Sequence, residues 1–127
     1  MHLVDTSVWI DFLRGKETPR VGLLESLLES GDAAICETIF YEICIGAASP
    51  RQFRNYRERF SGIPFLRLPQ NWHLQGAEMG YRLRSEGYKP YLSDLTIALT
   101  AILNQVPLLT ADKDFEAYRR LYDLAVE

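Results

Sequence analysis

Short apolar segments alternate with longer segments of helical periodicity along the whole chain. The apolar segments predict strands at residues 2–4, 33–36, 63–68 and 108–110, with a last edge strand at 124–126. The segments between them predict helices at residues 6–14, 19–30, 38–45, 50–61, 72–86, 92–104 and 113–122. This alternation predicts an α/β fold, a three-layer α/β/α sandwich with a mainly parallel sheet. The length of 127 residues fits one domain that spans residues 1–127.

Four acidic residues stand at or near the starts of predicted helices. Asp5 follows the first strand, and Glu42 lies in the first turns of the helix after the second strand. Asp94 is near the start of a strongly apolar helix, and Asp112 follows the strand at 108–110. In a parallel sheet the turns from strand to helix lie along one edge, and ligands bind there. We therefore expect these four carboxylates to converge.

Such a cluster of carboxylates requires a positive counter-charge. The partial positive charge of helix N-termini helps each acid to stay ionised, but it does not offset the mutual repulsion of four or five acids. No lysine or arginine recurs beside all of them in the sequence. Oxygen ligands with little histidine favour Mg²⁺ or Mn²⁺ over Zn²⁺. A metal of this kind polarises a phosphate and lowers the pKa of a bound water, so the cluster predicts hydrolysis of phosphate esters.

Each acid also has a purely structural interpretation. Asp5 alone is a helix N-cap, Asp94 alone is a favourable first-turn acid, and Asp112 alone is a turn residue. Glu42 is harder to explain in this way, because the surrounding segment IFYEICIG is otherwise apolar and a buried glutamate needs a partner. The prediction of a site therefore depends on the joint placement of the four acids.

The stretch LLTADKDF carries a further acid, Asp114, two residues after Asp112. Two roles fit Asp114: a ligand of a second metal ion, or an acid in the first turn of a helix. We expect the intervening Lys113 to face the solvent.

The distribution of charge is compatible with a nucleic-acid partner. The net charge is −3, but without the five acids of the predicted site 12 acids remain against 14 bases, which leaves a surface of net charge +2. Eleven of the bases are arginine, whose planar guanidinium fits phosphate well. Candidate phosphate contacts are Arg14, Lys16, Arg51, Arg54, Arg57 and Arg59. The last four belong to one predicted helix, where a solvated helix face is the alternative explanation.

Several features predict a cytoplasmic protein without a membrane segment. Cys36 and Cys44 form no C-x-x-C motif, and we expect buried thiols in a reducing compartment. Asp5 disfavours a signal peptide. The longest uncharged run, residues 95–111, is too short and too polar to span a bilayer comfortably.

Four motifs in order along the chain are similar to one known family. They are VDTSVWIDFLRG, YEICIG, SDLTIALTA and LLTADKDF. Together they resemble the PIN-domain ribonucleases, and among them the VapC-type toxins of type II toxin–antitoxin pairs. The resemblance covers nearly the whole chain. It implies an endoribonuclease that uses Mg²⁺ or Mn²⁺, forms a homodimer and is held inactive by a small cognate antitoxin protein.

The resemblance also implies roles for individual residues. It places Asp5, Asp94 and Asp112 as ligands of one metal ion, and Glu42 as a ligand through water or as the group that orients the attacking water. Asp114 matches an additional acid that some members use for a second metal. The resemblance makes Thr6 and Thr110 hydroxyl residues that support the site. RNA products with 5′-phosphate and 3′-hydroxyl ends are expected.

Apolar residues early in the chain have two possible roles. Trp9, Phe12 and Leu13 are expected in the core, with part of a groove for an amphipathic antitoxin segment as the alternative.

Two other functions are alternatives to a ribonuclease for this sequence. A receiver-type phospho-accepting domain has a similar length and an acidic pocket, but it needs an aspartate after its central strand, and the predicted strand at 63–68 ends in Leu68-Pro69. A catalytically silent PIN-like module that binds RNA or a partner is the second alternative. The presence of all four main acids argues against it.

Overall fold

Three short parallel strands form the centre of the fold. In the computed structural model, which describes residues 1–127, β1 (His2–Val4) lies between β2 (Ala33–Ala34) and β3 (Leu108–Leu109). Leu3 pairs with Ala34 on one side and with Leu108 on the other. The strands at 2–4 and 108–110 are therefore confirmed, and the strand at 33–36 is shorter than predicted.

Single β-bridges extend this sheet at both edges. Phe65 forms a parallel bridge with Ile35, and Val126 forms one with Leu108. The predicted strand at 63–68 is therefore wrong except at Phe65. Pro64 accepts a hydrogen bond from Ile35 N but has no N–H of its own to continue the ladder.

Seven α-helices surround the strands, and one 3₁₀ turn precedes the last of them. The helices are α1 (Thr6–Leu13), α2 (Pro19–Ser30), α3 (Glu37–Ile45), α4 (Pro50–Ser61), α5 (Trp72–Ser85), α6 (Leu92–Leu103) and α7 (Glu116–Leu121). The predicted helix at 113–122 is divided into the 3₁₀ turn η1 (Lys113–Phe115) and α7, because the Asp112 side chain closes a tight turn over Asp114.

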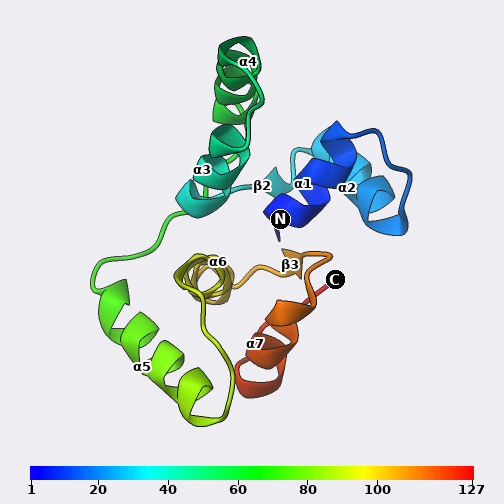
Figure 1. Ribbon diagram of the computed structural model, residues 1–127. Coiled ribbons are helices and arrows are strands. Elements are labelled where there is room, and N and C mark those ends of the chain that lie inside the picture. Colours follow the sequence, from blue (N-terminus) through cyan, green and yellow to red (C-terminus); the bar gives the residue numbers. More distant parts are fainter.

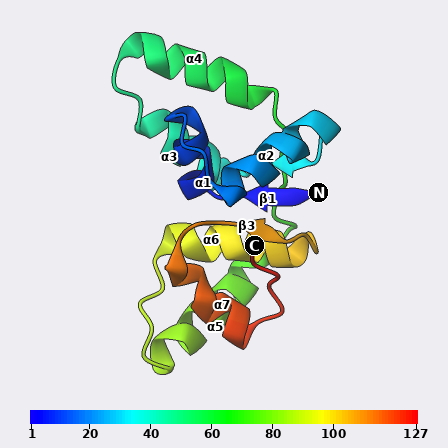
Figure 2. The same cartoon turned by 90° about the vertical axis from the view of Figure 1, so that its right-hand side faces the viewer.

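The helices form two layers with the sheet between them. The chain first passes from β1 to β2 at one edge of the sheet, and it later crosses back to β3 on the other side of β1. Right-handed connections that run in these two opposite directions place their helices on opposite faces of the sheet. Figure 2 shows α1–α4 on one side of β1 and α5–α7 on the other. The three-layer α/β/α fold is confirmed, and the turns that follow β1 and β3 come together in the middle of the molecule (Figure 1).

The core is built on β1 and α6. Leu3 and Val4 are fully buried, and α6 contributes the buried residues Leu95, Ile97, Ala98, Leu99, Thr100 and Ala101. Trp9 anchors α1 to this core, since its indole N–H donates to the carbonyl of Val4 at 3.0 Å and its ring packs edge-to-face on Phe60 with centroids 5.0 Å apart. Trp9 is thus a core residue and not part of a groove.

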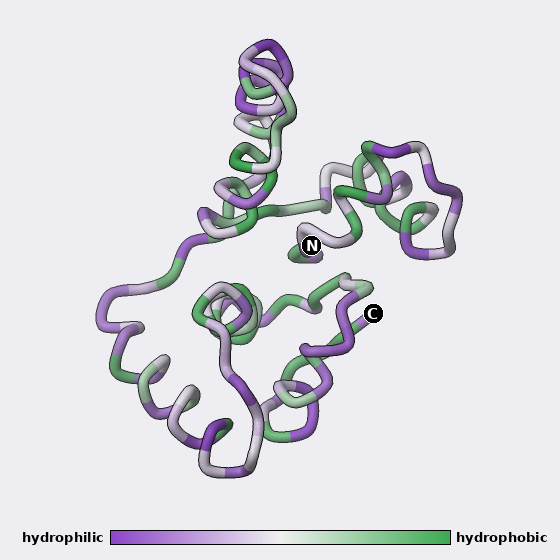
Figure 3. The backbone as a smooth tube through the Cα atoms, in the orientation of Figure 1, coloured by the Kyte–Doolittle hydropathy of each residue, from purple (hydrophilic) through white to green (hydrophobic).

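Helix α4 differs from the others because most of its surface is hydrophilic (Figure 3). Phe60 is buried and Tyr56 is half-buried, whereas Phe53 stays 39% exposed. Cys36 and Cys44 are buried and form no disulfide, as predicted. None of the helices combines the length and the apolar character that a membrane span needs.

Candidate metal centre

Asp5 is held at the end of β1 by a set of hydroxyl groups. Its carboxylate is buried, and Oδ2 accepts hydrogen bonds from Ser7 Oγ at 2.6 Å and from Thr110 Oγ1 at 2.8 Å. Ser7 N also donates to Oδ2 at 3.4 Å, which makes Asp5 the N-cap of α1. All of these donors meet Oδ2, so Oδ1 makes no hydrogen bond with the protein. The structural interpretation of Asp5 as an N-cap is therefore correct, and its role as a metal ligand stays a prediction.

The same hydroxyl groups connect Asp5 to the turn after β3. Ser7 Oγ accepts the N–H of Ala111 at 3.0 Å, and Thr110 Oγ1 accepts the N–H of Asp112 at 3.0 Å. Ser7 is a site residue that the sequence analysis missed. Its signal was a third polar residue in the motif VDTS, which was explained by the helix start alone.

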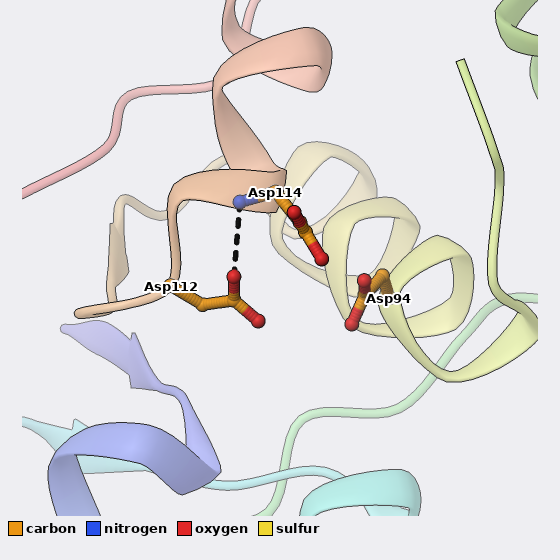
Figure 4. A group of neighbouring side chains, drawn as sticks. All are labelled: Asp94, Asp112 and Asp114. Carbon is orange, nitrogen blue, oxygen red and sulfur yellow. Dashed lines mark hydrogen bonds between the residues drawn. The ribbon is translucent and has the colours of Figure 1, made fainter.

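Three aspartates from two segments meet beside this network. One carboxylate oxygen from each of Asp94, Asp112 and Asp114 lies within 4.8 Å of the other two. Asp94 extends from the first turn of α6, while Asp112 and Asp114 come from the turn that begins η1 (Figure 4). Asp114 N donates to Asp112 Oδ1 at 2.9 Å, which fixes the two acids relative to each other.

The acids interact electrostatically as one group of five. Partial burial raises the pKa of Asp94 to about 6, and the charges of Asp112, Asp5, Asp114 and Glu42 add to the increase. The other four acids are therefore near enough to Asp94 to act on it electrostatically, while the carboxylate oxygens that lie within 4.8 Å of one another are those of Asp94, Asp112 and Asp114. None of the five ion pairs in the structure includes any of them. The carboxylates of Asp94 and Asp112 thus meet, together with that of Asp114. Thr110 links Asp5 to Asp112, and the roles of Asp5 and Glu42 as metal ligands stay predictions.

Glu42 approaches the cluster from the other side of the sheet. It accepts a hydrogen bond from Thr6 Oγ1 at 2.9 Å. Partial burial of its carboxyl raises its pKa, the bond from Thr6 lowers it, and the charges of Asp5 and Asp112 raise it. The expectation that this part of α3 is buried was wrong for Glu42, which is on the solvent-facing side while Ile39 and Ile43 face the core.

The donor set fits a hard divalent cation. It consists of carboxylate oxygens with no histidine and no neighbouring ion-paired base. Two oxygens that bind one Mg²⁺ or Ca²⁺ ion at about 2.0–2.6 Å are at most about 4–5 Å apart. The spacing of the three aspartates matches this requirement.

The basic residues predicted to bind phosphate are mostly not at this centre. Lys16 pairs with Asp11 at 3.4 Å, and the Arg57 guanidinium lies 5.5 Å from the ring centre of Phe53. Helix α4 with its four arginines projects away from α6 and α7 (Figure 1). Among the basic residues that were predicted to bind phosphate, Arg14 lines a cavity of about 310 Å³ together with Glu42.

Comparison with known proteins defines the class. The PIN-domain family model matches residues 2–121, so the chain belongs to the PIN-domain family. The chain is 27% identical over 128 residues to VapC ribonuclease Mb1587 of Mycobacterium bovis and to ribonuclease VapC11 of Mycobacterium tuberculosis. Each of these matches covers 98% of this chain and 96% of the relative.

Solved structures show the same fold. VapBC2 from Rickettsia felis, bound to a DNA fragment from its promoter, aligns with a TM-score of 0.79 and 18% identity over 99% of this chain and 96% of that one. FitAcB from Neisseria gonorrhoeae aligns with a TM-score of 0.73 and 25% identity over 99% and 96% of the two chains. The sequence resemblance to PIN-domain proteins of the VapC type is confirmed.

Proposed function

We propose that this protein is a metal-dependent endoribonuclease and the toxin of a toxin–antitoxin pair. The observation that carries the proposal is the meeting of Asp94, Asp112 and Asp114 within 4.8 Å, with none of the three in an ion pair. The full-length similarity to VapC ribonucleases supports RNA as the substrate. The whole chain, residues 1–127, forms the nuclease domain.

The acidic cluster would hold Mg²⁺ or Mn²⁺. Asp94, Asp112 and the free Oδ1 of Asp5 are the proposed ligands, and Asp114 is either a further ligand or the residue that fixes Asp112. When bound, such an ion polarises the scissile phosphate and offsets the negative charge that develops on it.

The protein's own groups position the reaction. Ser7 and Thr110 keep the Asp5 carboxylate in one orientation, so that it does not have to be ordered when RNA binds. Glu42 is the proposed group that orients the attacking water and accepts its proton, since its raised pKa brings it closer to neutral pH. The bond from Thr6 favours the ionised form of Glu42, which is the form that accepts a proton.

A cognate antitoxin is the proposed protein partner. A structural neighbour from Klebsiella pneumoniae is a toxin–antitoxin complex, with 23% identity and a TM-score of 0.68. Exposed apolar side chains on α1, α3 and α4 provide a surface for such a partner; they are Ile10, Tyr41, Ile45 and Phe53. The cavity that Arg14 shares with Glu42 would let an antitoxin side chain reach the acids.

A homodimer in the cytoplasm completes the proposal. Tyr81 on α5 and Leu92 on α6 are 72% and 77% exposed, and they line one apolar cavity that a second copy would cover. Two free buried thiols fit a reducing compartment.

The test of this function is cleavage of RNA with and without divalent metal. We expect purified protein to cut RNA in Mg²⁺ or Mn²⁺, to be inactive in excess EDTA, and to leave 5′-phosphate ends. Cleavage that persists in EDTA would contradict the proposed chemistry. RNA binding without cleavage, together with no heat of Mn²⁺ binding in calorimetry, would identify a silent binding module instead.

A further inference from the structure

A cavity opens directly beside the acidic centre. It has a volume of about 400 Å³ and lies between the loop before α6, the turn η1 and helix α7. Asp94 and Asp114 form part of its wall. Any polymer that places a phosphate at the acidic cluster therefore has this cavity as an immediate neighbour.

Three basic side chains line this cavity, and none of them is neutralised by an ion pair. Lys89, Lys113 and Arg120 belong to its wall, and none of them forms an ion pair. Arg119, next in sequence to Arg120, is outside the cavity and contacts Glu116 at 3.5 Å. Unpaired bases beside a cluster of acids are suited to an anionic ligand that extends past the cluster.

The cavity also contains a hydrogen-bond donor without a partner. Tyr118 lines the cavity and is only 3% exposed, and its hydroxyl is buried without any hydrogen bond. Burial and the nearby charges of Asp94 and Asp114 raise its pKa, so the phenol keeps its proton. Buried polar groups nearly always have a partner, and an acceptor on a ligand in this cavity would provide one for the Tyr118 hydroxyl.

An aromatic side chain stands at the mouth of the cavity. Tyr91 lines it and is 59% exposed, although large aromatic residues generally bury most of their surface. Exposed aromatic rings beside bases are typical of surfaces that stack unpaired nucleobases.

We propose that this cavity binds one nucleotide of single-stranded RNA adjacent to the scissile phosphate. Lys89, Lys113 and Arg120 contact the backbone phosphates, Tyr91 stacks on the base, and the Tyr118 hydroxyl donates a hydrogen bond to the base. The inference rests on the proposed ribonuclease function for the identity of the polymer.

Two consequences distinguish this subsite from general phosphate binding. A cavity of this volume accommodates a base that has left its stack, so an RNA duplex is excluded from it. A single buried donor also discriminates between ligands that have an acceptor at that point and ligands that lack one. We therefore expect a preference for single-stranded RNA and a base preference on one side of the cut.

The first test measures RNA binding without cleavage. Asp112→Asn protein is titrated into a fluorescent single-stranded RNA and into the matched duplex, and anisotropy is recorded at several salt concentrations. Adding Arg120→Ala is expected to weaken single-strand binding about tenfold and to lower the salt slope by about 1, in keeping with the loss of one phosphate contact. Adding Arg20→Ala, which removes an exposed and unpaired arginine of α2 outside the cavity, is the matched control and is expected to have little effect.

The second test measures base preference in the cleaving protein. A set of RNA oligonucleotides varies the base, or carries an abasic site, on either side of the cut. Tyr118→Phe is expected to reduce the base preference while cleavage of the abasic substrate stays the same. Tyr122→Phe removes a hydroxyl that contacts the carbonyl of Met79 outside the cavity, and it is the matched control.

The outcomes separate the two proposals. Equal binding by the Arg120→Ala and Arg20→Ala proteins, or equal affinity for single strand and duplex, overturns the subsite whether or not the protein cleaves RNA. An unchanged base preference in Tyr118→Phe overturns the role of Tyr118. Absence of cleavage by the wild type, with the predicted binding differences present, overturns the ribonuclease and keeps the subsite.

Discussion

Thr110 Oγ1 donates a hydrogen bond to Asp5 Oδ2 at 2.8 Å, although 105 residues separate the two in sequence. The same hydroxyl oxygen accepts the N–H of Asp112 at 3.0 Å. One buried threonine therefore aligns the acid at the end of β1 with the acid at the end of β3.

Thr110→Val tests this alignment, because it keeps the shape of the side chain and removes the hydroxyl. Metal affinity and cleavage are expected to fall by about 10–100-fold, as for other residues that orient metal ligands. The free energy of unfolding is expected to fall by about 1–3 kcal/mol, because Asp112 N loses its acceptor. Calorimetry with Mn²⁺ and chemical denaturation measure the two effects.

The control for this variant is Thr100→Val. Thr100 is equally buried, and its hydroxyl donates to the carbonyl of Thr96 within α6 and interacts with the thiol of Cys36, away from the three aspartates. It is expected to change stability without a comparable loss of metal affinity. Equal losses of metal affinity in both variants would show that Thr110 has no specific role in alignment.

Asp112→Asn and Asp114→Asn distinguish the two acids of the turn. Asparagine at 112 keeps an acceptor for Asp114 N but loses the charge, so the turn is retained while cleavage is expected to be abolished. Asp114→Asn is expected to weaken cleavage or to shift its dependence on metal concentration. Rates measured across a range of Mn²⁺ concentrations test both, and full activity in Asp112→Asn would exclude it as a ligand.

Thr6→Val is expected to shift the pH dependence of cleavage. The bond from Thr6 lowers the pKa of Glu42, so its removal raises that pKa further and moves the acidic limb of the activity profile to higher pH. Thr6→Ser retains the hydroxyl and should restore the original profile. A profile that does not move in Thr6→Val would mean that Glu42 does not control the acidic limb.

Stability without metal should decrease as the pH rises from about 4 to 6. The pKa of Asp94 is about 6 in the folded protein and 3.8 ordinarily, so the folded state binds more protons in this interval. Stability falls with pH wherever the folded state binds more protons, and the loss is complete above pH 6. Thermal unfolding of metal-free protein over this range measures the effect, and Mn²⁺ should raise Tm more at pH 7.5 than at pH 5.

The matched pair for this measurement is Asp94→Asn and Asp123→Asn. Both remove one negative charge, but Asp123 is exposed and belongs to no cluster. Asp94→Asn should flatten the pH dependence and reduce the response to Mn²⁺, whereas Asp123→Asn should change neither. An unchanged slope in Asp94→Asn would contradict this account.

Strands and helices with strong local signals were predicted well. The caps and stops around α2 are local: Thr18 accepts the N–H of Val21, and Gly31 ends the helix in a left-handed conformation. The segment at 63–68 was predicted wrongly, since its apolar residues pack against the core through side chains while only Phe65 pairs in the sheet. Apolar content alone does not distinguish these two ways of being buried.

The sequence by itself determined the class of fold, because short apolar segments alternate with helical ones along the chain. It also predicted that Asp94 and Asp112 lie together, as they do, whereas the roles of Asp5 and Glu42 as metal ligands stay predictions. It did not reveal Ser7, which looks like part of an ordinary helix start, nor the exposure of Glu42. It also did not reveal the cavity beside the acids, because Lys89 precedes α6 whereas Tyr118 and Arg120 belong to α7, and no motif connects the two segments. Only the packing of α7 against the loop before α6 brings them together. Contacts between a loop and a distant helix produce no repeating pattern of apolar residues from which they could be predicted.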